Sequence, residues 1–441
     1  MAKNTPRSYR NLVIYEVYVR NHGPNGTFAD VEADLPRIKA LGVDVIWFMP
    51  IHPIGEVARK GSLGSPYSIV DYRAVNPEYG TRADFKQLID RAHDLGLKVM
   101  IDAVFNHTAH DSILVEEHPD WFHQDESGRP VTTVPEWSDV IDLKHPNPAL
   151  TEYLVETIRG WVEFGVDGFR CDVASLLPLD VWLRARKAAA EVNPGVIWLA
   201  ESVHADFVAE RRANGLPTLS DSEVYRAFDL TYAYDIWPIW QATVRGDAPV
   251  ARYLEMLRFQ DCIYPENFVK LRYVENHDQA RIISYAPNRT QALAWTAFEA
   301  FNKGAFLIYA GQESGVTHRP SLFEIDKVEW GQYELSPFLS RLAALKKDPA
   351  QTEGQFTILD GDPAIQAAWH KPGESLYGVF NVNGAEGSVD VQLPDGVYHD
   401  VLHDKEISVR FGQIALLESA VILRYTEDVA LEPIYAPLLD Y

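Results

Sequence analysis

Residues 166–173 read VDGFRCDV, a short and mostly apolar run whose second half, RCDV, contains two charged residues, Arg170 and Asp172. A helical pattern over residues 150–165 precedes it. Such a run is typical of a parallel strand that is covered on both faces. Residues two apart in a strand point the same way, so Arg170 and Asp172 share one face. Buried charges are costly unless they are paired or needed, so the run predicts either a structural ion pair or a functional site.

Seven further runs have the same apolar character and alternate with helical patterns. They cover residues 12–19, 43–49, 97–104, 196–202, 226–230, 268–275 and 305–310. Eight strand–helix units in about 330 residues favour a closed barrel over an open sheet. We therefore predict an α/β protein whose main domain is a (β/α)8 TIM barrel.

Two segments depart from this alternation. Residues 107–140 are long, polar and rich in turn residues, which predicts a small inserted domain after the third strand. From residue 349 onward, short alternating strands predict a C-terminal antiparallel β-sandwich with an irregular tail, over 349–441. The barrel would then consist of residues 1–106 and 141–348.

Composition limits the partners that the protein can bind and the cellular compartment in which we expect it. The chain has 40 Lys and Arg against 63 Asp and Glu, a net charge of −23, which disfavours nucleic acids and anionic membranes as partners. Cys171 and Cys262 form no disulfide framework, and no apolar run is long enough to span a membrane. The first residues, MAKNTPRSYRNLV, do not resemble a signal peptide. We expect a cytoplasmic protein.

Polar residues gather where four of the predicted strands end. They are Asp102, Asn106 and His107 after the third strand, Arg170 and Asp172 after the fourth, Glu201 after the fifth, and Glu275, Asn276, His277 and Asp278 after the seventh. The carboxyl ends of barrel strands meet at one rim, which is where barrel enzymes hold their active sites. A single ion pair does not explain four converging polar strand ends.

Carboxylates on neighbouring strands suit glycoside hydrolysis, which needs one nucleophile or base and one protonated acid. Arg170 would keep Asp172 ionised as the nucleophile. Glu201 has no adjacent cation in the sequence and would stay protonated as the acid. Three more rim residues would bind the sugar and stabilise the transition state: His107, His277 and Asp278.

Several segments together resemble glycoside hydrolase family 13, the α-amylase family. They are DAVFNH (102–107), GFRCDVA (168–174), ESV (201–203) and ENHD (275–278), supported by GVDVIWFMPIHPIG (42–55), DLKHPNP (142–148) and GAFLIYAGQE (304–313). They follow the family's order, and the resemblance covers nearly the whole chain. The inserted segment corresponds to the family's domain B, and the C-terminal sandwich to its domain C.

The resemblance implies roles for individual residues. Asp172 would be the nucleophile, Glu201 the general acid/base and Asp278 the transition-state stabiliser. The sugar would be contacted by Arg170, His107 and His277, and Tyr67 would stack beside it. Asp102 and Asn106 look structural.

Some positions depart from the family pattern. Ser68 follows Tyr67 where exo-acting relatives carry an acid, which favours an open, endo-accessible cleft. Val173 follows the nucleophile, as in neopullulanase-like and α-1,6-active relatives, so linkage preference stays open. Ser175 and Leu176 replace residues found near the family's calcium site; Asn106 and Asp139 are weak candidates for Ca²⁺ ligands.

We predict a retaining α-glucan hydrolase, an intracellular α-amylase that cleaves α-1,4 linkages of maltodextrins and starch. It would need no cofactor, and Ca²⁺ is the one ion that stays open. The alternatives are an exo-acting α-glucosidase or cyclomaltodextrinase, a glucanotransferase using the same site, and a catalytically inactive binding subunit. Trp121 and Trp137 lie in the insert, where we expect packing rather than contact with a glucan.

Overall fold

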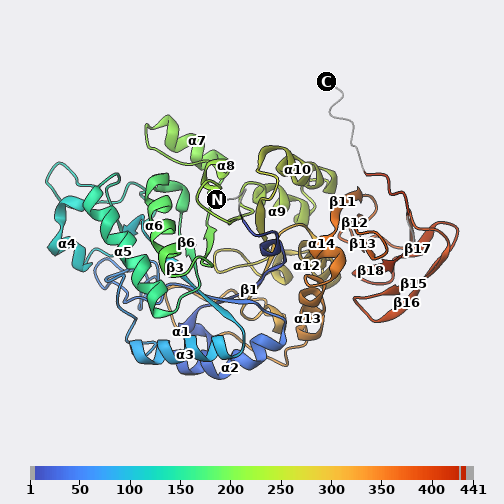
Figure 1. Cartoon of the computed structure of the whole chain (residues 1–441), viewed down its shortest axis with the longest axis horizontal. Helices are drawn as coiled ribbons and strands as arrows, with labels where there is room; N and C mark the ends of the chain where they lie inside the picture. Colours follow the sequence, from blue (N-terminus) through green and yellow to red (C-terminus); the bar gives the residue numbers. More distant parts are fainter. Residues whose placement is uncertain (1–4, 427–428, 434–441) are drawn as a thin grey trace.

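Eight parallel strands close into a barrel in the computed structural model, which describes residues 5–426 and 429–433. Around the barrel the strand order is β1-β10-β9-β8-β7-β6-β3-β2. The strands are β1 (Val13–Val17), β2 (Val45–Phe48), β3 (Lys98–Ala103), β6 (Gly168–Cys171), β7 (Ile197–Ala200), β8 (Leu230–Tyr232), β9 (Val269–Arg272) and β10 (Ala305–Tyr309). The predicted fold class is confirmed (Figure 1).

Helices follow each strand and cover the barrel. They are α1 (Val19–His22), α2 (Phe28–Ala40), α3 (Arg82–Asp94), α5 (Pro148–Phe164), α6 (Leu179–Val192), α7 (Ala205–Ala213), α8 (Asp221–Val224), α9 (Trp237–Arg245), α10 (Val250–Ile263), α11 (Ile282–Tyr285), α12 (Arg289–Phe301) and α13 (Ser336–Leu345). Short 3-10 turns lie at η2 (Arg7–Asn11), η4 (Ala174–Leu176) and η5 (Gln312–Ser314). None of the described helices is long and apolar enough to cross a membrane.

Local sequence sets where helix α5 begins and ends, directly before the strand that contains Arg170. Asn147 caps its start, because its side-chain oxygen accepts the backbone N–H groups of Ala149 and Leu150, and Pro148 occupies the first turn. Gly165 ends the helix with φ +116°, a conformation that favours glycine. The chain then turns directly into β6.

The sixth barrel strand lies later in the chain than predicted. The apolar run 226–230 suggested a strand, but β8 begins at Leu230. Phe228 instead packs its ring edge-on against Trp182 and Trp198, with ring centres 5.3 and 6.3 Å apart. Asp229 ends this turn and accepts hydrogen bonds from Arg186 at 2.6 and 2.9 Å. Packing against neighbouring elements, rather than strand pairing, therefore explains these apolar residues.

The segment between β3 and α5 contains little regular structure. Its elements are β4 (His107–Thr108), α4 (Ile113–Glu117), η3 (Pro119–Trp121) and β5 (Ile141–Asp142). Strands β4 and β5 pair with each other in an antiparallel sense, so both ends of the insert lie together beside the barrel rim.

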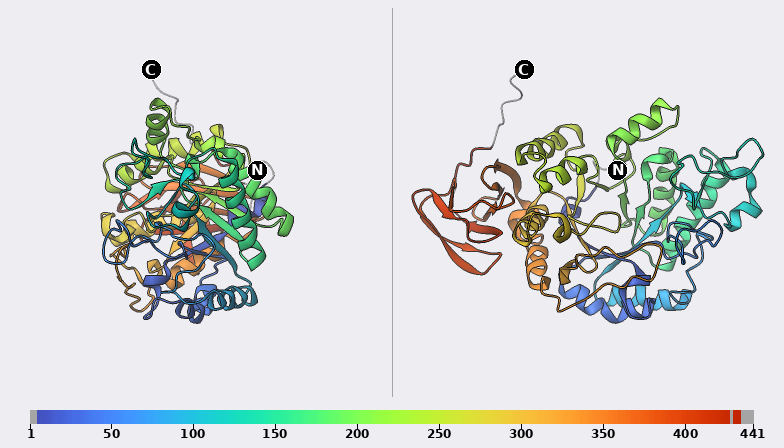
Figure 2. Two further views of the ribbon diagram at one scale, coloured as in Figure 1. Left: turned by 90° about the vertical axis from the view of Figure 1, so that its left-hand side faces the viewer. Right: turned by 180° about the vertical axis from the view of Figure 1, so that it is seen from behind.

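The C-terminal region forms antiparallel sheets beside the barrel. After α14 (Pro349–Glu353) come β11 (Gln355–Asp360), β12 (Ile365–His370), β13 (Ser375–Phe380), β14 (Ser388–Asp390), β15 (Gly396–Asp400), β16 (Lys405–Val409), β17 (Gln413–Ala415) and β18 (Ala420–Tyr425). Six of them form one sheet, and the β14–β17 pair packs against it through a shared apolar cluster. This domain and the insert lie at opposite ends of the long axis (Figures 1 and 2). Part of the predicted tail, residues 427–428 and 434–441, lies outside the described residues.

Candidate active site

Asp172 and Glu201 lie side by side at the carboxyl ends of neighbouring strands. Strand register pairs Cys171 with Ala200, the last residues of β6 and β7, so Asp172 and Glu201 are the first residues after these strands. The Glu201 N–H donates to the Cys171 carbonyl at 3.0 Å, which continues the pairing past the strand ends. Both carboxylates therefore stand at the same level of the rim.

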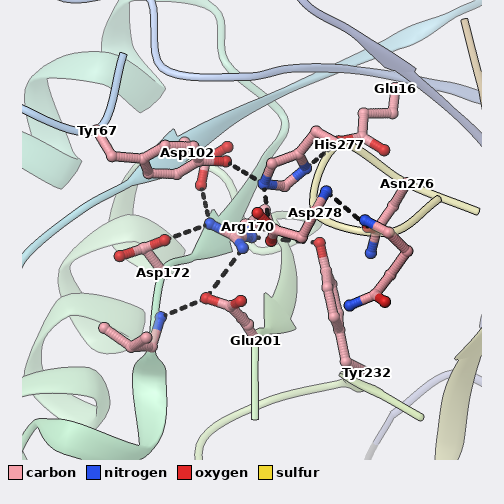
Figure 3. A network of polar contacts seen from close by, with 12 residues as sticks. Glu16, Tyr67, Asp102, Arg170, Asp172, Glu201, Tyr232, Asn276, His277 and Asp278 are labelled. Carbon is pink, nitrogen blue, oxygen red and sulfur yellow. Dashed lines mark hydrogen bonds and ion pairs between the residues drawn. The ribbon is translucent and has the colours of Figure 1, made fainter. Parts of the chain in front are cut away.

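Arg170 joins these carboxylates to a third one. Its Nη1 lies 2.7 Å from Asp172 Oδ1 and 2.6 Å from Asp102 Oδ1, and its Nη2 lies 2.9 Å from Glu201 Oε2. Figure 3 shows Arg170 at the centre of this network. The guanidinium is completely buried, and the Trp47 indole N–H holds the other oxygen of Asp102 at 3.0 Å. Asp102 therefore fixes Arg170, which agrees with its expected structural role.

The turn after Asp172 is strained in a way that serves the site. Val173 has φ +35°, in the left-handed region that β-branched residues rarely adopt. Such a conformation costs roughly 1–3 kcal/mol and persists where the surroundings impose it. Here it points the Val173 N–H at Glu201 Oε2, 2.8 Å away. The backbone thus adds a second donor to the carboxyl group that Arg170 already contacts.

Glu201 has the properties of an acid that keeps its proton at neutral pH. Burial, with smaller contributions from the nearby charges of Asp172 and Asp278, raises its pKa to about 8, although Arg170 opposes the shift. Glu201 has no adjacent cation in the sequence, but in the structure Arg170 contacts it from the neighbouring strand. Its protonation at pH 7 therefore follows from burial and neighbouring carboxylates rather than from distance to a cation.

Asp278 and His277 form a charged pair across the rim. Burial opposes ionisation of Asp278, but His277, whose Nε2 lies 3.1 Å from its Oδ2, lowers the pKa of Asp278 to about 2. Burial also disfavours the charged imidazole, yet Asp278 and Glu16 raise the pKa of His277 well above 6.5. The pair is thus imidazolium and carboxylate at neutral pH, and 38% of the Asp278 side chain remains exposed.

The remaining predicted sugar-contacting residues border the same cavity. Tyr67 stacks on His277, with ring centres 5.4 Å apart, and its hydroxyl lies 2.8 Å from Nε2 of that histidine. His107 Nε2 lies 3.9 Å from Asp172 Oδ2. The cavity has a volume of about 300 Å³, large enough for a small ligand. Its lining includes Lys60, Ser65, Tyr67, His107, Trp137, Asp139, Val140, Asp172, Val173, Glu201, His277, Asp278, Leu322 and Phe323.

Sequence reasoning missed two residues of this site. Glu16, completely buried at the end of β1, contacts Nδ1 of His277. Its signal was a lone acid inside the apolar run 12–19. Trp137 lines the cavity and approaches His107, with ring centres 5.6 Å apart, whereas we expected it to pack inside the insert. Trp121 does pack there, stacked on His118 at 3.8 Å.

The two candidate calcium ligands do not fit a cation site. The ammonium group of Lys60 lies 2.8 Å from Asp139 Oδ1 and also donates to the Glu136 carbonyl at 2.9 Å. Asn106 directs its amide toward His107 Nδ1, 3.4 Å away. Across the described residues, no three His, Cys, Asp or Glu side chains are grouped as a metal site. A lysine already supplies the positive charge beside Asp139, so we assign no step to calcium.

Two models of known protein families match the chain. The family model for the alpha-amylase catalytic domain matches residues 6–194 and 239–373. The chain belongs to the α-amylase family, glycoside hydrolase family 13. The model of the bacterial alpha-amylase C-terminal domain matches residues 355–423. Family membership was predicted from the sequence segments and is confirmed.

Solved structures of this family are close to the chain over almost its full length. A crystal structure of an alpha-amylase from Lactobacillus plantarum is 43% identical in sequence and has a TM-score of 0.91. The match covers 95% of this chain and 100% of that one. The maltogenic alpha-amylase AmyB from Thermotoga neapolitana is 33% identical, with a TM-score of 0.84 and the same coverage.

Curated relatives are more distant and longer. Alpha-amylase MalA of Haloarcula japonica is 27% identical over 414 residues, which are 89% of this chain and 58% of MalA. The maltogenic alpha-amylase of Bacillus acidopullulyticus is also 27% identical, over 83% of this chain and 64% of its own length. This chain therefore spans about three fifths of the length of these two relatives.

Proposed function

We propose that the protein is a retaining α-glucan hydrolase, an α-amylase that cleaves α-1,4 linkages of maltodextrins and starch. The observation that carries the proposal is the pair of carboxyl groups that share one guanidinium at neighbouring strand ends. Retaining glycosidases hold their two carboxyl groups about 5–5.5 Å apart, and inverting ones hold them farther apart to admit water. Contact of Asp172 and Glu201 with the same Arg170 favours the shorter spacing.

In the first step, the Asp172 carboxylate attacks the anomeric carbon while the glycosidic carbon–oxygen bond breaks. Glu201 gives its proton to the leaving oxygen, which matches its raised pKa of about 8. In the second step, the Glu201 carboxylate takes a proton from water, and the water oxygen displaces Asp172 from the anomeric carbon. Arg170 holds both carboxyl groups throughout and fixes their geometry.

Asp278 and His277 would act on the sugar rather than on the leaving group. An ionised Asp278 facing the cavity would stabilise the positive charge that develops on the ring. The imidazolium of His277 would donate to a sugar hydroxyl, and Tyr67, which lines the cavity, would stack beside the ring. His107 would contact the same sugar from the side of the insert.

An endo mode of attack is supported by Ser68. This side chain is completely buried and donates to the Asp139 carbonyl at 2.9 Å, so it places no carboxylate in the cavity. A reduced, cytoplasmic setting is supported by Cys171 and Cys262, neither of which forms a disulfide.

The first test is a product profile on maltoheptaose and starch, followed over time, with Asp172→Asn as the control. Mixed short maltodextrins at early times, absent with the variant, would support an endo-acting α-amylase. Glucose or maltose alone from the start would identify an exo-acting enzyme. Products longer than the substrate would identify a glucanotransferase, and no turnover of any α-glucan would favour an inactive binding subunit.

A further inference from the structure

Trp137 differs from the other tryptophan of the insert. Trp121 is 5% exposed and stacks on His118, with ring centres 3.8 Å apart, as expected of a residue that packs a small domain. Trp137 is only half-buried and lines the catalytic cavity, with its ring centre 5.6 Å from that of His107. Its indole N–H donates to no described residue. An aromatic surface and an unused donor therefore stand beside His107.

Lys60 holds the backbone on both sides of Trp137. Its ammonium group donates to the Glu136 carbonyl at 2.9 Å and lies 2.8 Å from Asp139 Oδ1. Asp139 is 6% exposed, so the ion pair is partly shielded from water. A single side chain from the loop before Tyr67 thus fixes the residues that flank Trp137.

Two further side chains from outside the turn hold the same stretch. The hydroxyl of Ser68 donates to the Asp139 carbonyl at 2.9 Å, and Nε2 of His110 lies 3.1 Å from the Ser138 carbonyl. Three consecutive residues, 137–139, are therefore bordered by or contain fixed backbone groups. Such a turn is ordered before any ligand arrives, so binding at Trp137 costs little conformational entropy.

The loop that contains Lys60 also contacts two other apolar residues of the cavity lining, Leu322 and Phe323. The Leu63 N–H donates to the Phe323 carbonyl at 3.0 Å. The Leu322 carbonyl accepts the Tyr18 hydroxyl at 3.1 Å. One short loop therefore sets where the aromatic and the apolar parts of the lining stand relative to each other.

Trp137 takes no part in the two chemical steps, but it lies close to the residue that begins them. His107 contacts both, since its Nε2 lies 3.9 Å from Asp172 Oδ2 and its ring faces that of Trp137. This places Trp137 within reach of a sugar bound next to the one that Asp172 attacks.

We propose that Trp137 forms a second sugar subsite, where its indole stacks on the glucose unit next to the cleaved one, and that Lys60 is the positioning residue that holds it there. The proposal rests on the proposed function, because the ligand is an α-glucan. The C–H face of a sugar ring packs on an aromatic ring, and a sugar hydroxyl accepts a hydrogen bond from the indole N–H.

Binding is measured with the full chain carrying Asp172→Asn, which should hold an α-glucan without cleaving it. Maltoheptaose is titrated by calorimetry and by tryptophan fluorescence. Adding Trp137→Ala should weaken binding about tenfold, and adding Trp137→Phe should remove most of the fluorescence change. Trp121→Phe is the matched control and should preserve both signals, because Trp121 packs inside the insert.

Kinetics of the active enzyme separate a subsite from a structural role. Trp137→Ala should raise KM for maltoheptaose about tenfold and change kcat by less than about threefold, because Trp137 touches no reacting group. Lys60→Met should raise KM about threefold, and Lys60→Arg, which keeps a donor for both oxygens, should restore it. Arg129→Met removes an exposed ion pair with Asp125 in the same insert and should change nothing.

The outcomes distinguish this proposal from the proposed function. A protein that neither binds nor cleaves any α-glucan would overturn both. Maltoheptaose binding and KM that stay unchanged in Trp137→Ala would overturn the subsite alone, and so would a loss of kcat without a rise in KM. An unchanged KM in Lys60→Met would overturn the positioning role of Lys60.

Discussion

Two buried clusters of this protein are both built from ion pairs, but they serve different roles. At the rim, Arg170 holds Asp102, Asp172 and Glu201 beside an open cavity. Between β9 and the helices α8 and α10, Lys270 contacts Asp221 and Asp235. Tyr232 touches both clusters, since its hydroxyl lies 3.4 Å from Arg170 Nε and its carbonyl accepts from Lys270 Nζ at 3.1 Å.

The difference lies in what else the acids contact. Oδ2 of Asp235 accepts from the Gln260 amide at 2.7 Å and the Tyr264 hydroxyl at 2.8 Å, so neutral donors hold it in place. Glu201 receives the Val173 N–H and Arg170, but it also faces ligand space and has a pKa of about 8. A buried ion pair therefore becomes chemically useful when one acid keeps a transferable proton next to a cavity, as Glu201 does.

The largest expected effect concerns that proton. Glu201→Gln should lower kcat on maltoheptaose by about 100- to 10,000-fold. In the native enzyme, kcat/KM should fall as pH rises through about 8, because Glu201 then loses its proton. The variant should lack this fall, and Glu210→Gln, on the exposed face of α7, should retain it. A variant whose activity still declines at the same pH would assign the proton to another group.

The second prediction tests the buried cluster of Lys270, Asp221 and Asp235. Lys270→Met should lower the free energy of unfolding by about 3–5 kcal/mol, because it leaves two buried acids without their cation. Activity per folded molecule should not change. Denaturant unfolding and kinetics at low temperature measure both quantities. Lys86→Met, which removes an exposed pair with Asp90, should cost at most about 1 kcal/mol. Loss of kcat in Lys270→Met without loss of stability would contradict the comparison.

Glu16 lies between the two kinds of role, because it is buried like a structural acid but touches a cavity residue. Glu16→Gln removes one of the two carboxylates that raise the pKa of His277, so that pKa should fall. His277 should then lose its proton at lower pH, and KM should increase about tenfold above that pH. Titration of the His277 ring by NMR checks the shift. An unchanged titration would mean that Asp278 alone keeps His277 charged.

The smallest expected effect concerns metal removal. Lys60 already neutralises Asp139, so a chelator should leave the melting temperature and the activity unchanged. Lys60→Met should cost at most about 1 kcal/mol, because its side chain is 38% exposed. A melting temperature that falls with the chelator and recovers with added calcium would show that another set of ligands binds the ion.

Much of the fold could be predicted because strand and helix periodicity is local. The eight apolar runs, the polar residues at their ends and the turn-rich insert are all visible within short windows of the chain. The start of the sixth strand was predicted wrongly because a local window shows only local periodicity. Phe228 looks like a strand residue in its window, but it lies before β8 and packs on Trp182 and Trp198.

By itself, the sequence determined that Asp172, Glu201 and Asp278 follow strands of one barrel, because alternation and strand order place them at one rim. Only the tertiary structure decided which charges touch. It put Arg170 against Glu201, Glu16 against His277, and Lys60 against Asp139, and it set the depth at which each is buried. Protonation depends on burial and on distances of a few ångströms between groups that lie far apart in the chain, and no local pattern encodes those distances.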